Sequence, residues 1–276
     1  MLDDILHIFV PREYTLSNGK VVKEKFNYTP YITIAVLIVT FVALKYCKVN
    51  IAYFIKRFDK FAAIVKAMVP PTWGFWNEVK KPMLDTIVMS ILGTAFGCLF
   101  ALPMSFYLSN NFRFNKYYMA GHRGLLSVLR TLPTMVYASL ISVVIGTGAV
   151  AGTIAIAIFT YTIAVKMMYE QIETIDMGPY EAMESTGATR VQCMIDTAYP
   201  QVRGFFWSTV LYCFETNVRS AAILGYVGAG GIGVIINAQL SWRNYGNAGL
   251  ILFVLVLTVV AIETTSRIIR RKLVQG

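Results

Sequence analysis

TLPTMVYASLISVVIGTGAVAGTIAIAIFTYTIAV, residues 131–165, is a run of 35 residues without a charged side chain. A helix rises about 1.5 Å per residue, so this run is too long for one crossing of a hydrocarbon core of about 30 Å. The run must therefore fold back on itself, and Gly146-Thr147-Gly148 is the expected turn. The stretch predicts two membrane-spanning helices, at about 124–145 and 149–168.

Four further apolar runs are long enough to cross a membrane. They lie at about 31–47, 86–109, 204–225 and 246–266. The chain has 276 residues, of which 56% are hydrophobic and 14% charged, a composition too apolar for an ordinary soluble domain. The sequence thus predicts an all-α polytopic membrane protein of about six transmembrane helices. Its single transmembrane domain is expected over 31–276, after a tail of residues 1–30.

Six crossings place both termini on one side of the membrane. That side carries 14 Lys and Arg residues, against 9 on the opposite side, where a basic stretch at 45–81 weakens the bias. Because positive loops stay inside, both termini are expected in the cytoplasm. The net charge is +10, and the basic residues are spread along the loops, which argues against nucleic-acid binding. The four cysteines lack the spacing that is typical of a metal site.

Residues 50–69 predict an amphipathic helix that lies in the membrane interface on the outer side. Apolar side chains recur at helical spacing, lysines fall between them, and Pro70-Pro71 ends the helix. The segment is expected to bind membrane lipid as a surface anchor, and a platform for a substrate-delivering partner is the alternative.

Gly93 and Gly97, and likewise Gly148 and Gly152, stand four residues apart in apolar runs. Small residues at this spacing let two helices approach closely in lipid. We expect them to serve packing within the chain, with a dimer seam as the alternative.

A polar segment, EAMESTGATRVQCMIDTAYP from Glu181 to Pro200, separates two of the apolar runs within a loop at about 170–201. Glu181 to Met194 can form a short amphipathic helix. A rigid helix on the membrane surface can act as a lever that passes the movement of a docked partner to the spans. An ordinary surface helix between two spans is the alternative.

Glu215, Asn217 and Arg219 lie deep in the apolar run that begins near Gly204. Ionisable groups inside a membrane segment are costly, and they face a partner charge, a bundle interior or a water-filled path. Glu215 and Arg219 are four residues apart, so they share a helix face and can pair. Two interpretations stay open: a structural ion pair, or a path in which Asn217 and Arg219 meet a phosphate-like oxyanion. Arg130, near the start of the third span, is interpreted as a snorkelling residue.

The run Gly228-Ala-Gly230-Gly231-Ile-Gly233 fits the GxGxxG pattern of dinucleotide-binding loops. No strand is predicted before it and no acidic residue lies about 20 residues after it, so we reject that function. In a membrane, irregular backbone is tolerated where it is buried in protein or lines a cavity. The run predicts a bend or a gate element with Tyr226 as a plug, or simply a tight helix turn.

The segment from Glu181 to Pro200 resembles the EAA loop of ABC-importer permeases, which docks on a cytoplasmic ATPase. Met183, Thr197 and Tyr199 depart from the family pattern. The resemblance implies an ATPase-coupling role for Glu181, Ala182, Gly187, Ala188 and Pro200. The residues expected in the translocation path or gate are Glu215, Asn217, Arg219, Tyr226, Gly228, Gly230, Gly231 and Gly233.

Asn217-Val-Arg219-Ser220 and the run from Leu224 to Gly233, together with Tyr14–Lys23 and Pro70–Trp73, resemble the permease subunit of phosphonate ABC importers. The resemblance implies a homodimer with a path at its interface and two cytoplasmic ATPase subunits that carry ATP and Mg. It also implies an external binding protein that delivers phosphonate or a related phosphorus oxyanion. This chain would then hold no cofactor, no metal and no catalytic residue, and would not itself be an enzyme.

Two alternatives to a phosphonate permease stay open. One is a permease for methionine or another small solute on the same scaffold. The other is an ATP-independent secondary transporter, which would more often show paired broken helices in two halves.

Overall fold

The computed structural model describes residues 13–16, 19–23, 28–49, 51–112 and 115–275. The expected tail of residues 1–30 is therefore described only in part, and Asn18 and Asn50 lie outside the described residues. By its internal contacts the chain divides into two compact units, residues 1–63 and 64–276.

A short hairpin in the first unit departs from the all-helical expectation. Strands β1 (Glu13–Thr15) and β2 (Val21–Lys23) pair antiparallel, with Tyr14 opposite Val22. Gly19 in the connecting turn has φ +75°, a conformation that glycine adopts without steric strain.

Helix α2 (Thr29–Tyr46) occupies the first expected span, and it is long and apolar enough to cross a membrane. None of its residues is buried within the chain. Its backbone hydrogen bonds are internal to the helix, so it satisfies its polar groups without a neighbouring element.

The amphipathic segment, expected as one helix over 50–69, is instead two helices. They are α3 (Ile51–Lys56) and α4 (Phe58–Ala67). The break falls at Arg57, whose carbonyl accepts a hydrogen bond from the Lys60 N–H at 3.0 Å, three residues on. This tighter spacing interrupts the α-helical pattern. The Arg57 guanidinium lies 4.3 Å from the ring centre of Tyr53, across the break.

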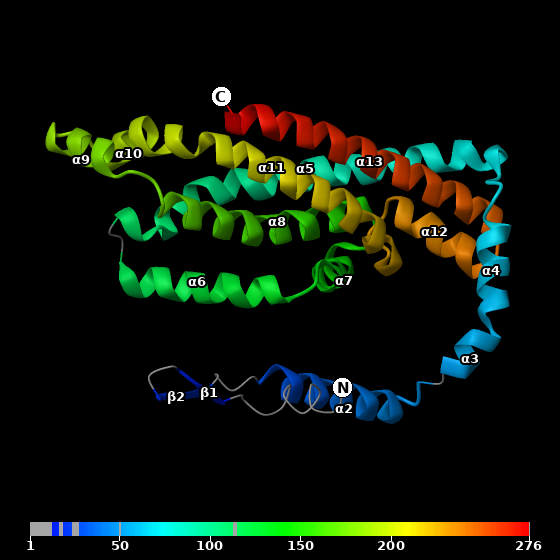
Figure 1. Ribbon diagram of the computed structural model, residues 1–276. Helices are drawn as coiled ribbons and strands as arrows, with labels where there is room; N and C mark the ends of the chain where they lie inside the picture. Colours follow the sequence, from blue (N-terminus) through cyan, green and yellow to red (C-terminus); the bar gives the residue numbers. More distant parts are fainter. Residues whose placement is uncertain (1–12, 17–18, 24–27, 50, 113–114, 276) are drawn as a thin grey trace. The chain divides into compact units, whose positions relative to one another are not determined.

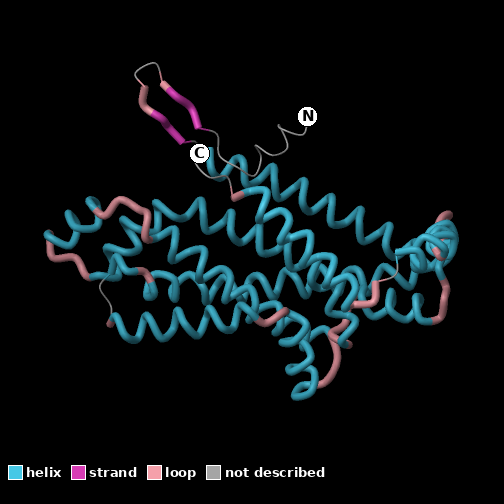
Figure 2. The backbone as a smooth tube through the Cα atoms, turned by 60° about the horizontal axis from the view of Figure 1, so that its bottom comes forward, coloured by secondary structure: helices cyan, strands magenta, loops and turns pink. Residues whose placement is uncertain are grey.

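The second unit is a set of helices joined by short loops, drawn in cyan and pink in Figure 2. Its longer helices are α5 (Trp76–Leu108), α6 (Lys116–Thr131), α7 (Thr134–Ile145), α8 (Ala149–Ile172), α11 (Tyr199–Leu224), α12 (Ile232–Ser241) and α13 (Tyr245–Gln275). Its shorter ones are η1 (Trp73–Phe75), η2 (Asn110–Phe112), α9 (Gly178–Ser185), α10 (Arg190–Cys193), η3 (Met194–Ala198) and η4 (Gly225–Val227). Helices α5, α8, α11 and α13 lie side by side, with α9 and α10 beyond one end (Figure 1).

The described residues contain four helices that are each long and apolar enough to cross a membrane. Two bent pairs can each form one further span, which makes up to six. The pairs are α6 with α7, bent by 91°, and the helix through α11 and η4 with α12, bent by 49°. This agrees with the expectation of about six transmembrane helices.

The third span, expected as one helix at about 124–145, is two helices meeting almost at a right angle. Helix α6 ends at Thr131, and α7 begins at Thr134. Pro133 lacks an N–H for the helix ladder, and it restricts Leu132 before it to an extended conformation with ψ 128°. The proline therefore breaks the span that the uncharged composition had predicted to be continuous.

Glycines bring α5 and α8 into close contact. A Cβ on Gly93 would lie 2.5 Å from Cγ2 of Ile156, and one on Gly97 would lie 2.7 Å from Cβ of Thr160. Both distances are shorter than any real Cβ contact allows. The expectation that this glycine pair serves packing within the chain is thus confirmed.

Candidate functional site

The segment expected to form one helix over residues 181–194 is broken in the middle. Helix α9 ends at Ser185, and Gly187 turns the chain with φ +88°. Helix α10 then begins behind Thr189, whose N–H donates to the Gln192 side chain at 2.9 Å. In return the Gln192 N–H donates to the Thr189 hydroxyl at 3.4 Å. This capping box starts a second helix, so the single-helix expectation is wrong.

An aromatic chain anchors this α9–α10 segment (Gly178–Ala198) to the core. Tyr180 on α9 is only 5% exposed, and its ring centre lies 5.2 Å from that of Phe112. The Phe112 ring lies 5.8 Å from Phe106, which belongs to α5. Burial raises the pKa of Tyr180, and the nearby Glu184 raises it further, so this phenol stays neutral. Through Phe112, which belongs to η2, these rings connect α9 to α5.

The residues expected to couple to an ATPase lie mostly on the outside of the α9–α10 segment. Glu181, Ala182 and Gly187 are exposed, and Ala188 is half-buried. A Cβ on Gly187 would meet nothing within 4 Å, so the open side of the turn is free within the chain. These residues form an accessible face on an anchored segment.

Pro200, by contrast, lies inside a continuous helix. It occupies the first turn of α11, which follows the π-helical turn η3 without a gap. Proline cannot donate to the helix ladder and its ring crowds the carbonyl four residues back, and the wider π turn accommodates both effects. The helix that contains the fifth expected span therefore begins before Pro200.

A three-residue charge cluster lies where α11 packs against α13. The Nη2 atoms of Arg219 and Arg270 each lie 2.9 Å from a different carboxylate oxygen of Glu215. The Glu215 side chain is 9% exposed, against 47% for Arg219 and 28% for Arg270. The sequence predicted the Glu215–Arg219 pair correctly. It missed Arg270, because that residue stands among the basic residues of the C-terminal tail.

Asn217 faces away from this cluster, into the packed centre of the unit. It is 2% exposed, and its amide nitrogen donates to the Thr94 hydroxyl at 2.8 Å and to the Thr160 hydroxyl at 2.7 Å. The amide thus ties α11 to both α5 and α8. The structure does not bring Asn217 together with Arg219, and the Asn217 amide, which was expected to meet a substrate, is bonded internally.

The glycine loop, residues 225–233, packs against α5, α8 and α11 and is partly buried. Gly228, Gly230 and Gly231 have φ of +75°, +83° and +72°, which favours glycine at each position. A Cβ on Gly230 would lie 2.8 Å from the Ala149 nitrogen at the start of α8. A Cβ on Gly233 would lie 2.0 Å from the Ala222 carbonyl oxygen. The loop is therefore a tightly packed bend between α11 and α12.

Hydrogen bonds from other elements hold this bend. The Ile232 N–H, at the start of α12, donates to the Thr86 hydroxyl of α5 at 2.8 Å. The Gly148 N–H, in the turn before α8, donates to the Gly228 carbonyl at 3.0 Å. Tyr226, expected as a plug, is half exposed within η4. Thr86 was not singled out from the sequence, because hydroxyl residues also fit ordinary apolar helices.

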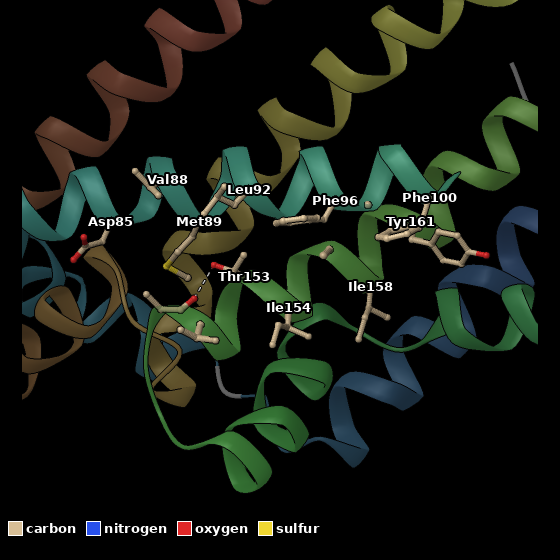
Figure 3. A pocket seen from close by; sticks show the side chains of 14 residues that line it. Asp85, Val88, Met89, Leu92, Phe96, Phe100, Thr153, Ile154, Ile158 and Tyr161 are labelled. Carbon is tan, nitrogen blue, oxygen red and sulfur yellow. Dashed lines mark hydrogen bonds between the residues drawn. The ribbon is translucent and has the colours of Figure 1, made fainter. Parts of the chain in front are cut away.

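A groove of about 760 Å³ runs along α5 and α8 (Figure 3). Its labelled side chains are mainly apolar, including Phe96, Phe100 and Ile158, and among the described residues Asp85 is the one charged residue that lines it. The groove contains neither the charge cluster nor the exposed residues of the α9–α10 segment. An apolar lining does not suit an oxyanion, the kind of ligand that the phosphonate-permease resemblance implies.

Comparison with known proteins gives consistent matches. Residues 93–276 match the family described as "Binding-protein-dependent transport system inner membrane component". The chain is 30% identical to the phosphite transport system permease protein PtxC of Stutzerimonas stutzeri, over 76% of each chain. It is 29% identical to the putative phosphite transport system permease protein HtxC of the same organism, over 92% of this chain and 90% of the relative.

Among solved structures, an inward-facing form of the MetNI methionine ABC transporter has a chain of the same fold. The TM-score is 0.64 at 20% identity, over 73% of this chain and 99% of that one. With the family match, this fold makes the chain a multi-pass membrane protein of the permease type. The chain belongs to the family of inner membrane components of binding-protein-dependent transport systems.

Proposed function

We propose that this chain forms the translocation path of an ATP-driven importer for phosphite, phosphonate or a related phosphorus oxyanion. The observation that carries the proposal is the cluster of Arg219, Glu215 and Arg270 within the spans. One carboxylate faces two guanidinium groups, so the cluster has a surplus positive charge. Charges at membrane depth are retained for function more often than for stability.

Arg219 is the member of the cluster that is best placed to meet a ligand. Glu215 engages one of its nitrogens, while 47% of its side chain stays accessible. A guanidinium has five N–H donors in a planar fork, so donors are left for an oxyanion. Arg270 shares the same carboxylate and prevents Glu215 from neutralising Arg219 fully.

The relatives support the choice of solute. Two permeases that align over most of this chain are named for phosphite transport. The methionine transporter shares only the fold at 20% identity, so it does not argue for methionine. A phosphorus oxyanion also agrees with the chemistry of the charge cluster, whereas a neutral solute gains nothing from it.

Coupling to ATP is assigned to the α9–α10 segment. In this proposal two copies of the chain form the path, and two cytoplasmic ATPase subunits dock on the exposed face that includes Glu181, Ala182 and Gly187. Both termini then lie in the cytoplasm, and a binding protein delivers the solute from outside. The contact of Tyr180 with Phe112 passes the motion of the ATPase to α5.

The structure also contains two broken spans, where the sequence indicated a single glycine-rich break. Broken helices were the sign expected of an ATP-independent transporter. The break at Pro133 has a local cause in the proline itself, and the family match favours the ATP-driven importer.

The test is uptake by proteoliposomes that contain this chain with its ATPase and binding protein. Arg219→Ala is expected to abolish ATP-dependent phosphite uptake while the complex stays assembled. Arg267→Ala is the matched control, because Arg267 also pairs with a glutamate four residues away but is 60% exposed. Arg267→Ala should transport normally. Uptake at the wild-type rate by Arg219→Ala would show that the charge cluster is not part of the translocation path. Uptake of methionine instead of phosphite would show that the proposed solute is wrong.

A further inference from the structure

A second group of cations lies apart from the Glu215 cluster, in a narrow crevice between α6 and α8. Arg123 and Arg130 of α6 and Lys166 of α8 line it together, beside Ser127 and Tyr169. None of these residues has a role in the transport path proposed above. Three cations that converge on one crevice repel one another unless negative charge offsets them.

Two of the three cations have partners within the chain. Arg123 donates from Nε to the Leu108 carbonyl at 3.0 Å and forms an ion pair with Glu173. Its guanidinium carbon lies 4.3 Å from the ring centre of Tyr169, which fixes its position. Lys166 lies 3.3 Å from the Glu170 carboxylate. Each of these two charges is therefore matched by one acid.

Arg130 is the cation without a partner. Among the described residues, none forms a hydrogen bond or ion pair with the Arg130 guanidinium or with the Ser127 hydroxyl one turn earlier, and both side chains are exposed and open to a ligand. Arg130 is the next-to-last residue of α6, directly before the bend at Pro133. Arg130 is exposed, which agrees with the snorkelling arginine that the sequence predicted. Here Arg130 lines the same crevice as Arg123 and Lys166.

We propose that this crevice binds a phosphoryl group. Arg130 supplies the planar fork, Lys166 supplies a point charge, and the Ser127 hydroxyl supplies a further donor. The cavity measures about 10 Å³, the size of one water molecule, so one phosphoryl oxygen enters and the rest of the group stays at the mouth. The surplus charge of the crevice matches the single negative charge of a phosphodiester or a monoanionic oxyanion.

Two sources carry this chemistry, the headgroup of an anionic phospholipid and the transported phosphorus oxyanion. The second source rests on the proposed function, whereas the first does not. A lipid headgroup would make the crevice a site that couples bilayer composition to the α6–α7 bend. A transported oxyanion would make the crevice a second binding site along the translocation path.

The lipid arm uses the assembled transporter in nanodiscs of phosphatidylcholine with phosphatidylglycerol, and native mass spectrometry counts the retained phosphatidylglycerol. The oxyanion arm uses nanodiscs of phosphatidylcholine alone, and equilibrium dialysis measures binding of radiolabelled inorganic phosphate and phosphite. The variants are Arg130→Gln and Arg130→Lys. Arg267→Gln removes a cation that is already paired with Glu263, and serves as the control.

Binding in one of the two arms is expected to weaken about tenfold in Arg130→Gln, to recover in part in Arg130→Lys, and to stay unchanged in Arg267→Gln. The arm that responds identifies the source. Unchanged binding in both arms, with the variant folded and assembled, would overturn the proposal. Failure of the wild-type transporter to take up phosphite would refute the proposed function alone, because the lipid arm is measured without transport.

Discussion

The α9–α10 turn and the glycine loop both depend on glycines with positive φ, but for different physical reasons. At Gly187 a Cβ would meet nothing within 4 Å, so only the backbone conformation requires glycine. At Gly230 a Cβ would also lie 2.8 Å from backbone nitrogen of α8. The first region is an exposed turn that a partner can cover, and the second is a buried joint that holds helices together.

This difference predicts two kinds of sensitivity. Substitutions at Gly225, Gly230 and Gly233 should damage the fold, because the atoms nearest to an added Cβ there are backbone atoms, which cannot rotate away. Substitutions in the α9–α10 turn should leave the fold intact and act on coupling. The expected loss of stability decreases from the glycine loop to the α9–α10 turn.

Gly233→Ala is expected to have the largest effect. Its Cβ would lie 2.0 Å from the Ala222 carbonyl oxygen and 2.8 Å from the Gly225 Cα. Relief of this overlap requires α11 and α12 to separate, at a cost of about 3 kcal/mol or more. Size-exclusion chromatography and thermal unfolding in detergent should show loss of folded protein. Gly121→Ala is the control, because a Cβ there meets nothing within 4 Å; equal stability of the two variants would contradict the packed joint.

Thr86→Val should have a smaller but clear effect on the same joint. Valine keeps the shape of threonine but leaves the buried Ile232 N–H without its acceptor, which costs about 1–3 kcal/mol. The midpoint of thermal unfolding should fall accordingly. Thr153→Val is the matched control, since its hydroxyl bonds only to the Ala149 carbonyl of its own helix. If both variants unfold at the wild-type temperature, Thr86 does not hold the bend.

Gly187→Ala should have the smallest effect on stability. An alanine at φ +88° costs about 1–2 kcal/mol, confined to an exposed turn. We expect a fall of only a few degrees in the midpoint of thermal unfolding, with no loss of folded protein, and weaker coupling between ATP hydrolysis and phosphite uptake. Gly187→Asn is the comparison, because asparagine tolerates positive φ better than alanine. A large loss of folded protein in Gly187→Ala would erase the contrast between the two regions.

Much of the fold could be predicted from the sequence because lipid imposes simple rules on length and polarity. Mostly apolar runs of about 20 residues indicated the spans, and Gly146-Thr147-Gly148 indicated the turn that separates α7 from α8. The bend at Pro133 was missed because hydropathy does not register a single proline. The break in the α9–α10 segment was missed because Gly187 and the capping box at Thr189 outweigh the helical period.

The candidate sites were predicted less completely, because their partners are distant in the sequence. Glu215 and Arg219 could be paired from their spacing on one helix. Arg270 lies 55 positions after Glu215, and only the packing of α13 on α11 brings them together. In the same way, Thr94 is 123 positions before Asn217. Their hydrogen bond joins α11 to α5 and makes Asn217, which was expected in the path, a buried packing residue.

By itself the sequence determined that this is a multi-pass helical membrane protein with a polar segment between two spans, charges at membrane depth and a glycine run in the fifth span. Those features follow from local composition and spacing, which the bilayer and the helix period translate directly into structure. Only the tertiary structure decided which charges are matched, which amide is satisfied and which glycines are in contact. These properties depend on distances between helices, and no local pattern encodes them.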